Sequence, residues 1–180
     1  VTSTEYGNGD IAEFTYDAYD RLTGKTFNDV SVFSLTYNNN GQLARRVDNA
    51  GGYTTDYAYD LAGRLVQSQQ SAGRNARTTY SYDNQNRLKR QDNYIDGYLH
   101  ALVYEYGEDD LLSKCWNGGY RFEYSYNNLN LPVTELITPM TGVTLKNTYE
   151  YDENDPTAIA THKYYKNNTL QDYYDYTYDN

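Results

Sequence analysis

Polar and apolar residues alternate along the chain in short runs, and turn-forming residues separate the runs. In YRFEYSY (residues 120–126), the aromatic residues Tyr120, Phe122, Tyr124 and Tyr126 fall on one face, and the residues between them fall on the other. A period of two is typical of a β-strand. The sequence contains no helical periodicity, so the alternation predicts an all-β fold.

The runs belong to a repeat that returns every 20 to 27 residues. Each copy ends a run with an anchor tyrosine, and the residue two positions earlier is also Tyr in six of the eight copies. A repeat of this length predicts an array whose stability comes from contacts between neighbouring units. The anchors are Tyr16, Tyr37, Tyr59, Tyr82, Tyr106, Tyr126, Tyr151 and Tyr178.

A turn signal follows each anchor. The next residue, and the residue three positions beyond it, are Gly, Asn or Asp in the first seven copies, and these types favour turns and left-handed backbone. The pattern predicts a hairpin made by a type I turn and a left-handed residue. The predicted turn residues are Asp17, Asp20, Asn38, Gly41, Asp60, Gly63, Asp83, Asn86, Gly107, Asp110, Asn127, Asn130, Asp152 and Asp155.

Six residues after the anchor, an apolar residue begins the next strand in five copies. These residues are Leu22, Leu43, Leu65, Leu88 and Leu112. A second turn signal, such as NAGG (49–52), DG (96–97) or KNN (166–168), stands at the far end of the units. Each unit is therefore predicted to be two strands and two turns. We expect residues 1–180 to form a single array of about seven and a half units, truncated at both ends, with no separate domain.

The phrase YDLAGRL (59–65), which returns as YDNQNRL (82–88), resembles the YD repeat of the Rhs proteins. Bacterial wall-associated polymorphic toxins, insecticidal toxin-complex subunits and animal teneurins carry similar repeats. The sequence departs from the pattern at Gly107, which replaces the acid, at Pro132, which takes the leucine position, and within residues 149–159. These departures leave the register of the later repeats open.

The resemblance implies antiparallel hairpins that wind as a curved, spiralling sheet into part of a larger hollow shell. In the bacterial toxins, such a shell encloses a C-terminal effector. The implied function is a non-catalytic structural segment whose partners are the rest of the parent chain and its enclosed effector. The implied location is the cell surface of a bacterium or the space outside the cell.

Charge and composition narrow the functional classes. The formal net charge is -10 and the basic residues are scattered, which disfavours binding to nucleic acid because that requires a basic surface. No apolar run approaches the ~20 residues of a membrane-spanning helix. A single cysteine excludes an internal disulfide and a zinc site built from cysteines. The 24 tyrosines supply area that can be buried, and this argues against disorder.

Residues with catalytic or metal-binding chemistry are few and lack a recognised pattern. His100, His162 and Cys115 have no partner at a catalytic spacing. The acidic stretches EDD (108–110) and DENDP (152–156) coincide with repeat turns and lack the ligand spacing of a calcium loop. We therefore expect no enzymatic activity, no metal and no cofactor.

One alternative function remains open from the residues. Exposed tyrosines on a repeating sheet form a carbohydrate-binding or adhesive surface if their rings stack on sugars. The competing interpretation is that the tyrosines pair across strands and send their hydroxyls to water or to the backbone. We also expect the chain to self-associate through its two sheet edges.

Overall fold

The computed structural model describes residues 2–71 and 75–178, and it confirms the all-β prediction. The described residues form sixteen strands with turns between them and contain no helix. Strands β1 to β8 are Thr2–Glu5, Ile11–Tyr16, Leu22–Phe27, Val30–Tyr37, Leu43–Asp48, Tyr53–Tyr59, Leu65–Ser71 and Ala76–Tyr82. Strands β9 to β16 are Leu88–Ile95, Tyr98–Tyr106, Leu112–Trp116, Tyr120–Tyr126, Pro132–Pro139, Leu145–Tyr151, Ile159–Lys166 and Thr169–Asp175.

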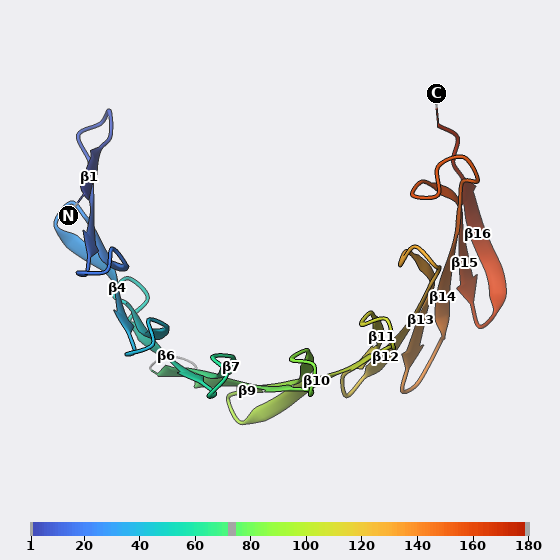
Figure 1. Cartoon of the computed structure of the whole chain (residues 1–180), viewed down its shortest axis with the longest axis horizontal. Coiled ribbons are helices and arrows are strands. Elements are labelled where there is room, and N and C mark those ends of the chain that lie inside the picture. Colours follow the sequence, from blue (N-terminus) through green and yellow to red (C-terminus); the bar gives the residue numbers. More distant parts are fainter. Residues whose placement is uncertain (1, 72–74, 179–180) are drawn as a thin grey trace. The chain divides into compact units, whose positions relative to one another are not determined.

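Strand order in the sheet is the order of the sequence, from β1 to β16. Apart from the connection between β7 and β8, each strand is joined to the next by a short turn, as Figure 1 shows. The pairing is antiparallel, for example between β6 and β7 and between β12 and β13. Every backbone pairing is therefore between neighbours in sequence, as the two-strand, two-turn unit predicts.

The chain forms two compact units, which are described separately. Unit 1 comprises the residues up to Ser81 together with Asp92–Leu99, and unit 2 comprises Tyr82–Gln91 together with the residues from His100 onward. A single array without a separate domain stays a prediction. Within the described ranges, no helix is long and apolar enough to cross a membrane.

Six of the eight anchor tyrosines mark the same irregularity at a strand end. The register shifts between the residue before the anchor and the anchor itself, for example between Ala58 and Tyr59 and between Ser125 and Tyr126. This β-bulge pairs Tyr59 with Leu65 and Tyr126 with Pro132. The same six-residue separation pairs Tyr16 with Leu22, Tyr37 with Leu43 and Tyr106 with Leu112.

The turns at the other end of the units, here called the far turns, include shorter connections than the turns after the anchors. Asp96 and Gly97 have φ values of 50° and 85°. Two consecutive residues with positive φ are the mark of a type I′ turn, whose twist matches that of the flanking strands. Asn28 with Asp29, and Asn167 with Asn168, show the same pair of positive φ values.

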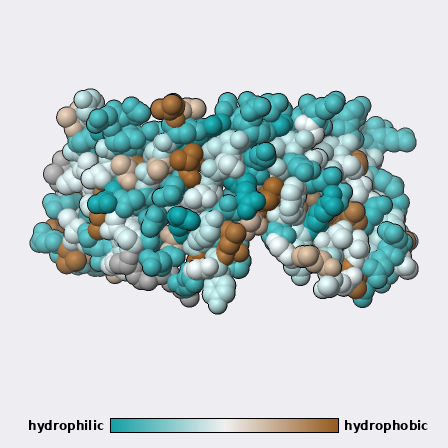
Figure 2. Space-filling model, turned by 90° about the horizontal axis from the view of Figure 1, so that it is seen from below, coloured by the Kyte–Doolittle hydropathy of each residue, from teal (hydrophilic) through white to brown (hydrophobic). Residues whose placement is uncertain are grey.

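Little of this sheet is fully buried. Among the described residues, Ala12 is the only hydrophobic residue in the buried class, with 0% of its surface exposed. Most strand side chains are half-buried, because each strand packs mainly against its two neighbours and no second layer among the described residues covers it. Figure 2 shows hydrophobic residues scattered in small groups over a largely hydrophilic face. Cross-strand side-chain pairs are therefore the main source of packing.

Candidate functional site

The repeat turn, defined as the segment from an anchor tyrosine to the start of the next strand, is the most regular arrangement of side chains. In the turn after Tyr59, the amide of Asp60 donates to the carbonyl of Arg64 at 2.9 Å, and the amide of Gly63 donates to the carbonyl of Asp60 at 3.0 Å. The Asp60 carboxylate accepts from the amides of Ala62 at 3.0 Å and Arg64 at 2.9 Å. The residue after the anchor therefore holds the turn through its backbone and its side chain.

Four further copies repeat this side-chain bonding. In each, one side-chain oxygen of the residue after the anchor accepts from the amides two and four positions further on. The four residues are Asp17, Asn38, Asp83 and Asn127. Asp and Asn are interchangeable here because both carry the accepting oxygen. Gly107 carries none, and in that copy the carboxylate of Asp109 accepts from the Leu111 amide at 3.3 Å.

The second turn residue, three positions after the first, has left-handed backbone in six copies. Its φ values are 59° at Asp20, 80° at Gly41, 82° at Gly63, 67° at Asn86, 64° at Asp110 and 63° at Asn130. Gly, Asn and Asp tolerate this conformation, which other residues adopt only with strain.

Asp155 does not have the conformation expected from the pattern. Its φ is not positive, and its carbonyl accepts from the amide of Ala158 at 2.9 Å. The closing bond runs from the Asp152 amide to the Ala158 carbonyl, and Tyr151 pairs with Ile159. The connection is longer by two residues than in the other copies, so the left-handed position is not needed at Asp155.

An arginine after the left-handed residue completes the turn in three copies. The Arg64 guanidinium donates from Nε to the Asp60 carboxylate at 2.7 Å, and its Nη2 lies 2.7 Å from the same oxygen. Arg21 binds Asp17 and Arg87 binds Asp83 in the same way. In the copy that begins with Asn38, Gln42 takes the place of the arginine and accepts from the Asn38 side-chain amide at 3.0 Å.

The anchor tyrosines join one repeat to the preceding one. The Tyr59 hydroxyl donates to the backbone carbonyl of Leu43 at 2.9 Å, across 16 residues of sequence. Five other anchors make the equivalent bond to the residue that begins the earlier strand. The pairs are Tyr37 with Leu22, Tyr106 with Leu88, Tyr126 with Leu112, Tyr151 with Pro132 and Tyr178 with Ile159.

The turn arginines reach the following repeat as well. The Arg21 guanidinium lies 4.5 Å from the ring centroid of Tyr37, and Arg87 lies 4.5 Å from that of Tyr106. Arg87 also donates to Asp110 in the following turn at 2.5 Å. Because an arginine over an aromatic face is attracted by the ring quadrupole, each of these side chains links its own turn to the next anchor. In the Asn38 copy, Gln42 donates to the carbonyl of Gly63 at 2.9 Å.

The remaining predicted residues have less regular surroundings. Tyr16 is 45% exposed, and Tyr82 ends β8. Pro132 keeps the register of the leucine position, since it pairs with Tyr126, and its carbonyl accepts from the Tyr151 hydroxyl at 2.7 Å. The residues after Tyr178 lie outside the described residues. The sequence interpretation missed the arginines of the turn and the tyrosine-to-carbonyl bonds. The recurrence of Arg one position before the apolar residue was the available signal.

The residues with catalytic or metal-binding chemistry that the sequence singled out include His162 and Cys115, and their surroundings are those of structural residues. The ring of His162 stacks on Tyr149, with centroids 4.7 Å apart, and its Nε2 lies 3.1 Å from Asn147 Oδ1. Cys115 is half-buried, and burial raises the pKa of its thiol, which disfavours the reactive thiolate. Burial also raises the pKa of the neighbouring Tyr124 to about 12. Over residues 2–71 and 75–178, no cluster of His, Cys, Asp or Glu has a metal-binding arrangement.

Three turn carboxylates, those of Asp17, Asp60 and Asp83, have lowered pKa values. At Asp60, the largest cause is the hydrogen bond from the Arg64 amide, and the Arg64 guanidinium adds to it. At Asp17 and Asp83, desolvation is the largest influence and raises the pKa, but the amide and arginine donors together outweigh it. These carboxylates are therefore held in their charged form by the turn.

Acidification is expected to weaken the turns. A carboxylate whose pKa is lower in the folded chain stabilises that chain above its unfolded pKa, and the contribution is lost as the pH falls through the folded pKa. The loss should therefore begin near the ordinary value of 3.8 and grow below it. Thermal unfolding at a series of pH values measures it. Asp60→Asn keeps the bonds seen at Asn38 but does not titrate, so its unfolding temperature should fall less on acidification than that of the parent. An equal fall in both proteins would contradict this role for Asp60.

Comparisons with known proteins agree with this geometry. Residues 37–76 match the family model described as RHS Repeat. The tRNA nuclease WapA of Bacillus subtilis (strain 168) is 27% identical over 131 residues, which cover 67% of the chain and 5% of that protein.

Solved structures show the same fold. The crystal structure of TcdB2-TccC3-Cdc42 matches 92% of the chain with a TM-score of 0.74 and 18% identity, and the chain covers 9% of it. The crystal structure of TcdB2-TccC3 matches 92% with a TM-score of 0.74 and 16% identity, and the chain covers 10% of it. The chain thus spans about a tenth or less of the proteins it matches.

Proposed function

We propose that the chain, whose residues 37–76 match the RHS Repeat model, belongs to that family and forms part of the wall of a larger β-shell. The shell encloses or displays a C-terminal effector of the same parent protein. In this role, the segment contributes a continuous sheet and performs no catalysis. Its partners are the neighbouring repeats of the parent chain and the enclosed effector.

The observation that carries the proposal is the contact between successive repeats. An anchor hydroxyl reaches a carbonyl of the preceding repeat, and a turn arginine packs on the anchor of the following one. Each repeat is thus completed by its neighbours on both sides, as in other repeat arrays. An arrangement of this kind suits a wall that can be extended by adding repeats.

The comparisons support a wall segment in a much larger protein. The chain matches TcdB2-TccC3 along 92% of its own length but covers only 10% of that chain. WapA is named a tRNA nuclease, and the chain matches 5% of it. A match to so small a fraction favours a scaffold segment over the part that cleaves RNA, and the turn aspartates are engaged in the turns themselves. We place the parent protein on the surface of a bacterium or outside the cell.

The alternative, a carbohydrate-binding surface made of exposed tyrosines, has weaker support. Tyr19 and Tyr98 are the most exposed tyrosines of the described residues, at 80% and 73%. Tyr19 lies in a repeat turn, whereas Tyr98 follows a far turn, so the two rings stand at opposite ends of the strands and share no platform. Self-association through the sheet edges stays a prediction.

Deleting one complete repeat from the parent protein tests the wall role. Removal of residues 60–82 joins Tyr59 to Asp83 and preserves the anchor-to-turn sequence. We expect the deletion to leave a foldable array that encloses its effector poorly, so that limited proteolysis cuts the effector region faster. The matched control, Asp60→Asn, keeps the repeat count and should retain the protection of the parent. Unchanged protection in the deletion variant would overturn the proposal.

A further inference from the structure

A cavity of about 490 Å³ lies against the face of β11 to β13, and all of its lining belongs to unit 2. Its walls include Glu105, Lys114, Trp116, Arg121, Thr138 and Met140. We call it the Trp116 pocket. Its volume lies within the ~300–1,000 Å³ that is usual for small-molecule sites.

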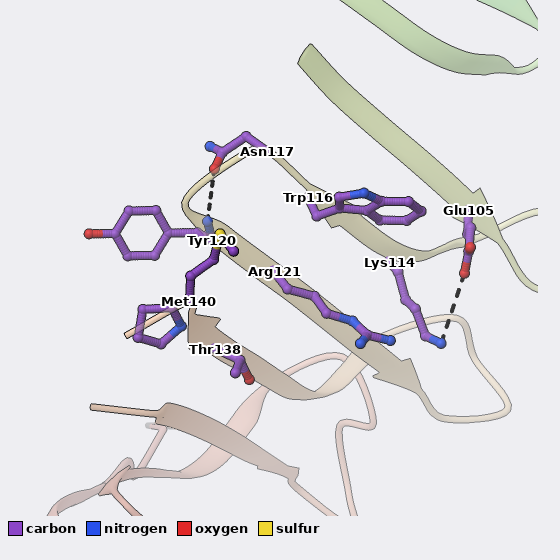
Figure 3. Close-up of a pocket in the computed structure, with 9 residues that line it drawn as sticks. Glu105, Lys114, Trp116, Asn117, Tyr120, Arg121, Thr138 and Met140 are labelled. Carbon is purple, nitrogen blue, oxygen red and sulfur yellow. Dashed lines mark hydrogen bonds and ion pairs between the residues drawn. The ribbon is translucent and has the colours of Figure 1, made fainter. Parts of the chain in front are cut away.

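The pocket lies where the two strands on either side of β12 differ in length. Strand β11 has 5 residues, whereas β13 has 8. The short β11 ends at Trp116, and the side chain of the next residue, Asn117, accepts from the amides of Gly119 and Tyr120 at 2.8 Å each. Strand β13 continues to Pro139, which pairs with Tyr120. The difference leaves the indole of Trp116 beside an open space at the end of the hairpin, as Figure 3 shows.

Register places an aromatic platform and polar groups on one face. Trp116 pairs with Arg121, and Arg121 pairs with Thr138, so the three side chains form a row across the strands. Lys114 lies two residues before Trp116 on the same face, opposite Glu105. Figure 3 shows Trp116, Lys114 and Arg121 directed to the same side of the sheet.

The charges of this face balance. Lys114 Nζ lies 3.9 Å from Glu105 Oε2, and Arg121 Nε lies 2.9 Å from Glu123 Oε1. Two cations therefore face two carboxylates, in a chain whose net charge is -10. Each cation of the pocket is thus paired with a carboxylate, which disfavours a phosphate-bearing ligand because such a ligand needs positive charge that is not already paired. The polar groups present both donors and acceptors, because ammonium and guanidinium donate, carboxylate accepts and the Thr138 hydroxyl does both.

We propose that the Trp116 pocket binds a neutral saccharide. One face of a sugar ring is made of C–H groups and packs on the flat indole, while the hydroxyls at its rim need donors and acceptors together. The geometry supplies the platform at Trp116 and the hydrogen-bonding groups at Arg121, Thr138 and Glu105. This site does not depend on the wall role, and it uses the tryptophan rather than the exposed tyrosines.

Trp116 supplies its own probe, because it is the only tryptophan of the chain. The 180-residue chain is titrated with glucose, galactose, maltose, cellobiose and the disaccharide of N-acetylglucosamine while tryptophan emission is recorded. We expect a saturable change in emission with at least one of these sugars. Calorimetry then compares variants. Trp116→Ala should abolish binding, and Arg121→Gln should weaken it about tenfold.

The control variant removes an arginine from a comparable ion pair outside the pocket. Arg45 donates to Asp56 across strands in unit 1 at 2.6 Å, and Arg45→Gln should leave sugar binding unchanged. Thermal unfolding verifies that each variant folds, and Arg121→Gln keeps the proposal testable if Trp116→Ala does not fold. No response to any sugar would overturn the proposal. A response only to a nucleotide or an apolar peptide would also overturn it, as would equal binding by Arg121→Gln and Arg45→Gln.

Discussion

Replacing Gly63 with valine is expected to lower the free energy of unfolding by about 2 kcal/mol. Gly63 has a φ of 82°, a conformation that a β-branched residue adopts only with strain. A Cβ at this position would also stand 3.3 Å from the Gln42 side-chain nitrogen, which donates to the Gly63 carbonyl. The substitution therefore strains its own turn and disturbs the link to the preceding one.

Urea unfolding of the 180-residue chain measures this loss, and Gly63→Asn provides the matched control. Asparagine occupies the same place in two other turns, with φ values of 67° at Asn86 and 63° at Asn130. We expect Gly63→Asn to cost less than about 1 kcal/mol, since Asn tolerates left-handed backbone. If valine and asparagine cost the same, backbone conformation is not what selects the residue at this position.

Removing the side chain of Tyr106 is expected to have the largest effect on stability, about 3 kcal/mol. The Tyr106 hydroxyl donates to the Leu88 carbonyl at 2.8 Å, and its ring lies 4.5 Å from the Arg87 guanidinium. The side chain is half-buried, and burial raises the pKa of its hydroxyl. Tyr106→Ala removes the hydrogen bond, the ring contact and the packed area together.

Two further variants separate these contributions. Tyr106→Phe keeps the ring and loses the hydrogen bond, so we expect a cost of about 1 kcal/mol. Tyr98→Ala serves as the control, because Tyr98 is 73% exposed, and its cost should stay within about 0.5 kcal/mol. A double-mutant cycle between Arg87→Ala and Tyr106→Ala should give a coupling energy that differs from zero. Additive effects, or a Tyr106→Ala cost no larger than that of Tyr98→Ala, would contradict the link between repeats.

The turn could be predicted from the sequence because its requirements are local. A side-chain acceptor after the anchor and a left-handed residue three positions later each restrict the residue type, as Asp60 and Gly63 illustrate. The six-residue separation between anchor and apolar residue then determines the register, for example of Tyr59 with Leu65. Such constraints leave a repeated signature in the sequence even when only one chain is known.

The links between repeats were not predicted, because they join residues whose proximity depends on the assembled sheet. The Tyr106 hydroxyl and the Leu88 carbonyl are 18 residues apart in sequence. Every residue type carries a backbone carbonyl, so the acceptor does not restrict which residue stands at position 88. A backbone acceptor carries no sequence signal, as Pro132 in a leucine position demonstrates. The Trp116 pocket was missed for a related reason. It results from the lengths of β11 and β13, which the turn pattern does not specify.

The bonds between anchors and carbonyls all run in one direction, from a later tyrosine to an earlier strand. A ribosome delivers the acceptor first and the donor 14 to 19 residues later. During synthesis, we therefore expect each repeat to gain its last hydrogen bond only after the anchor tyrosine of the following repeat has been made.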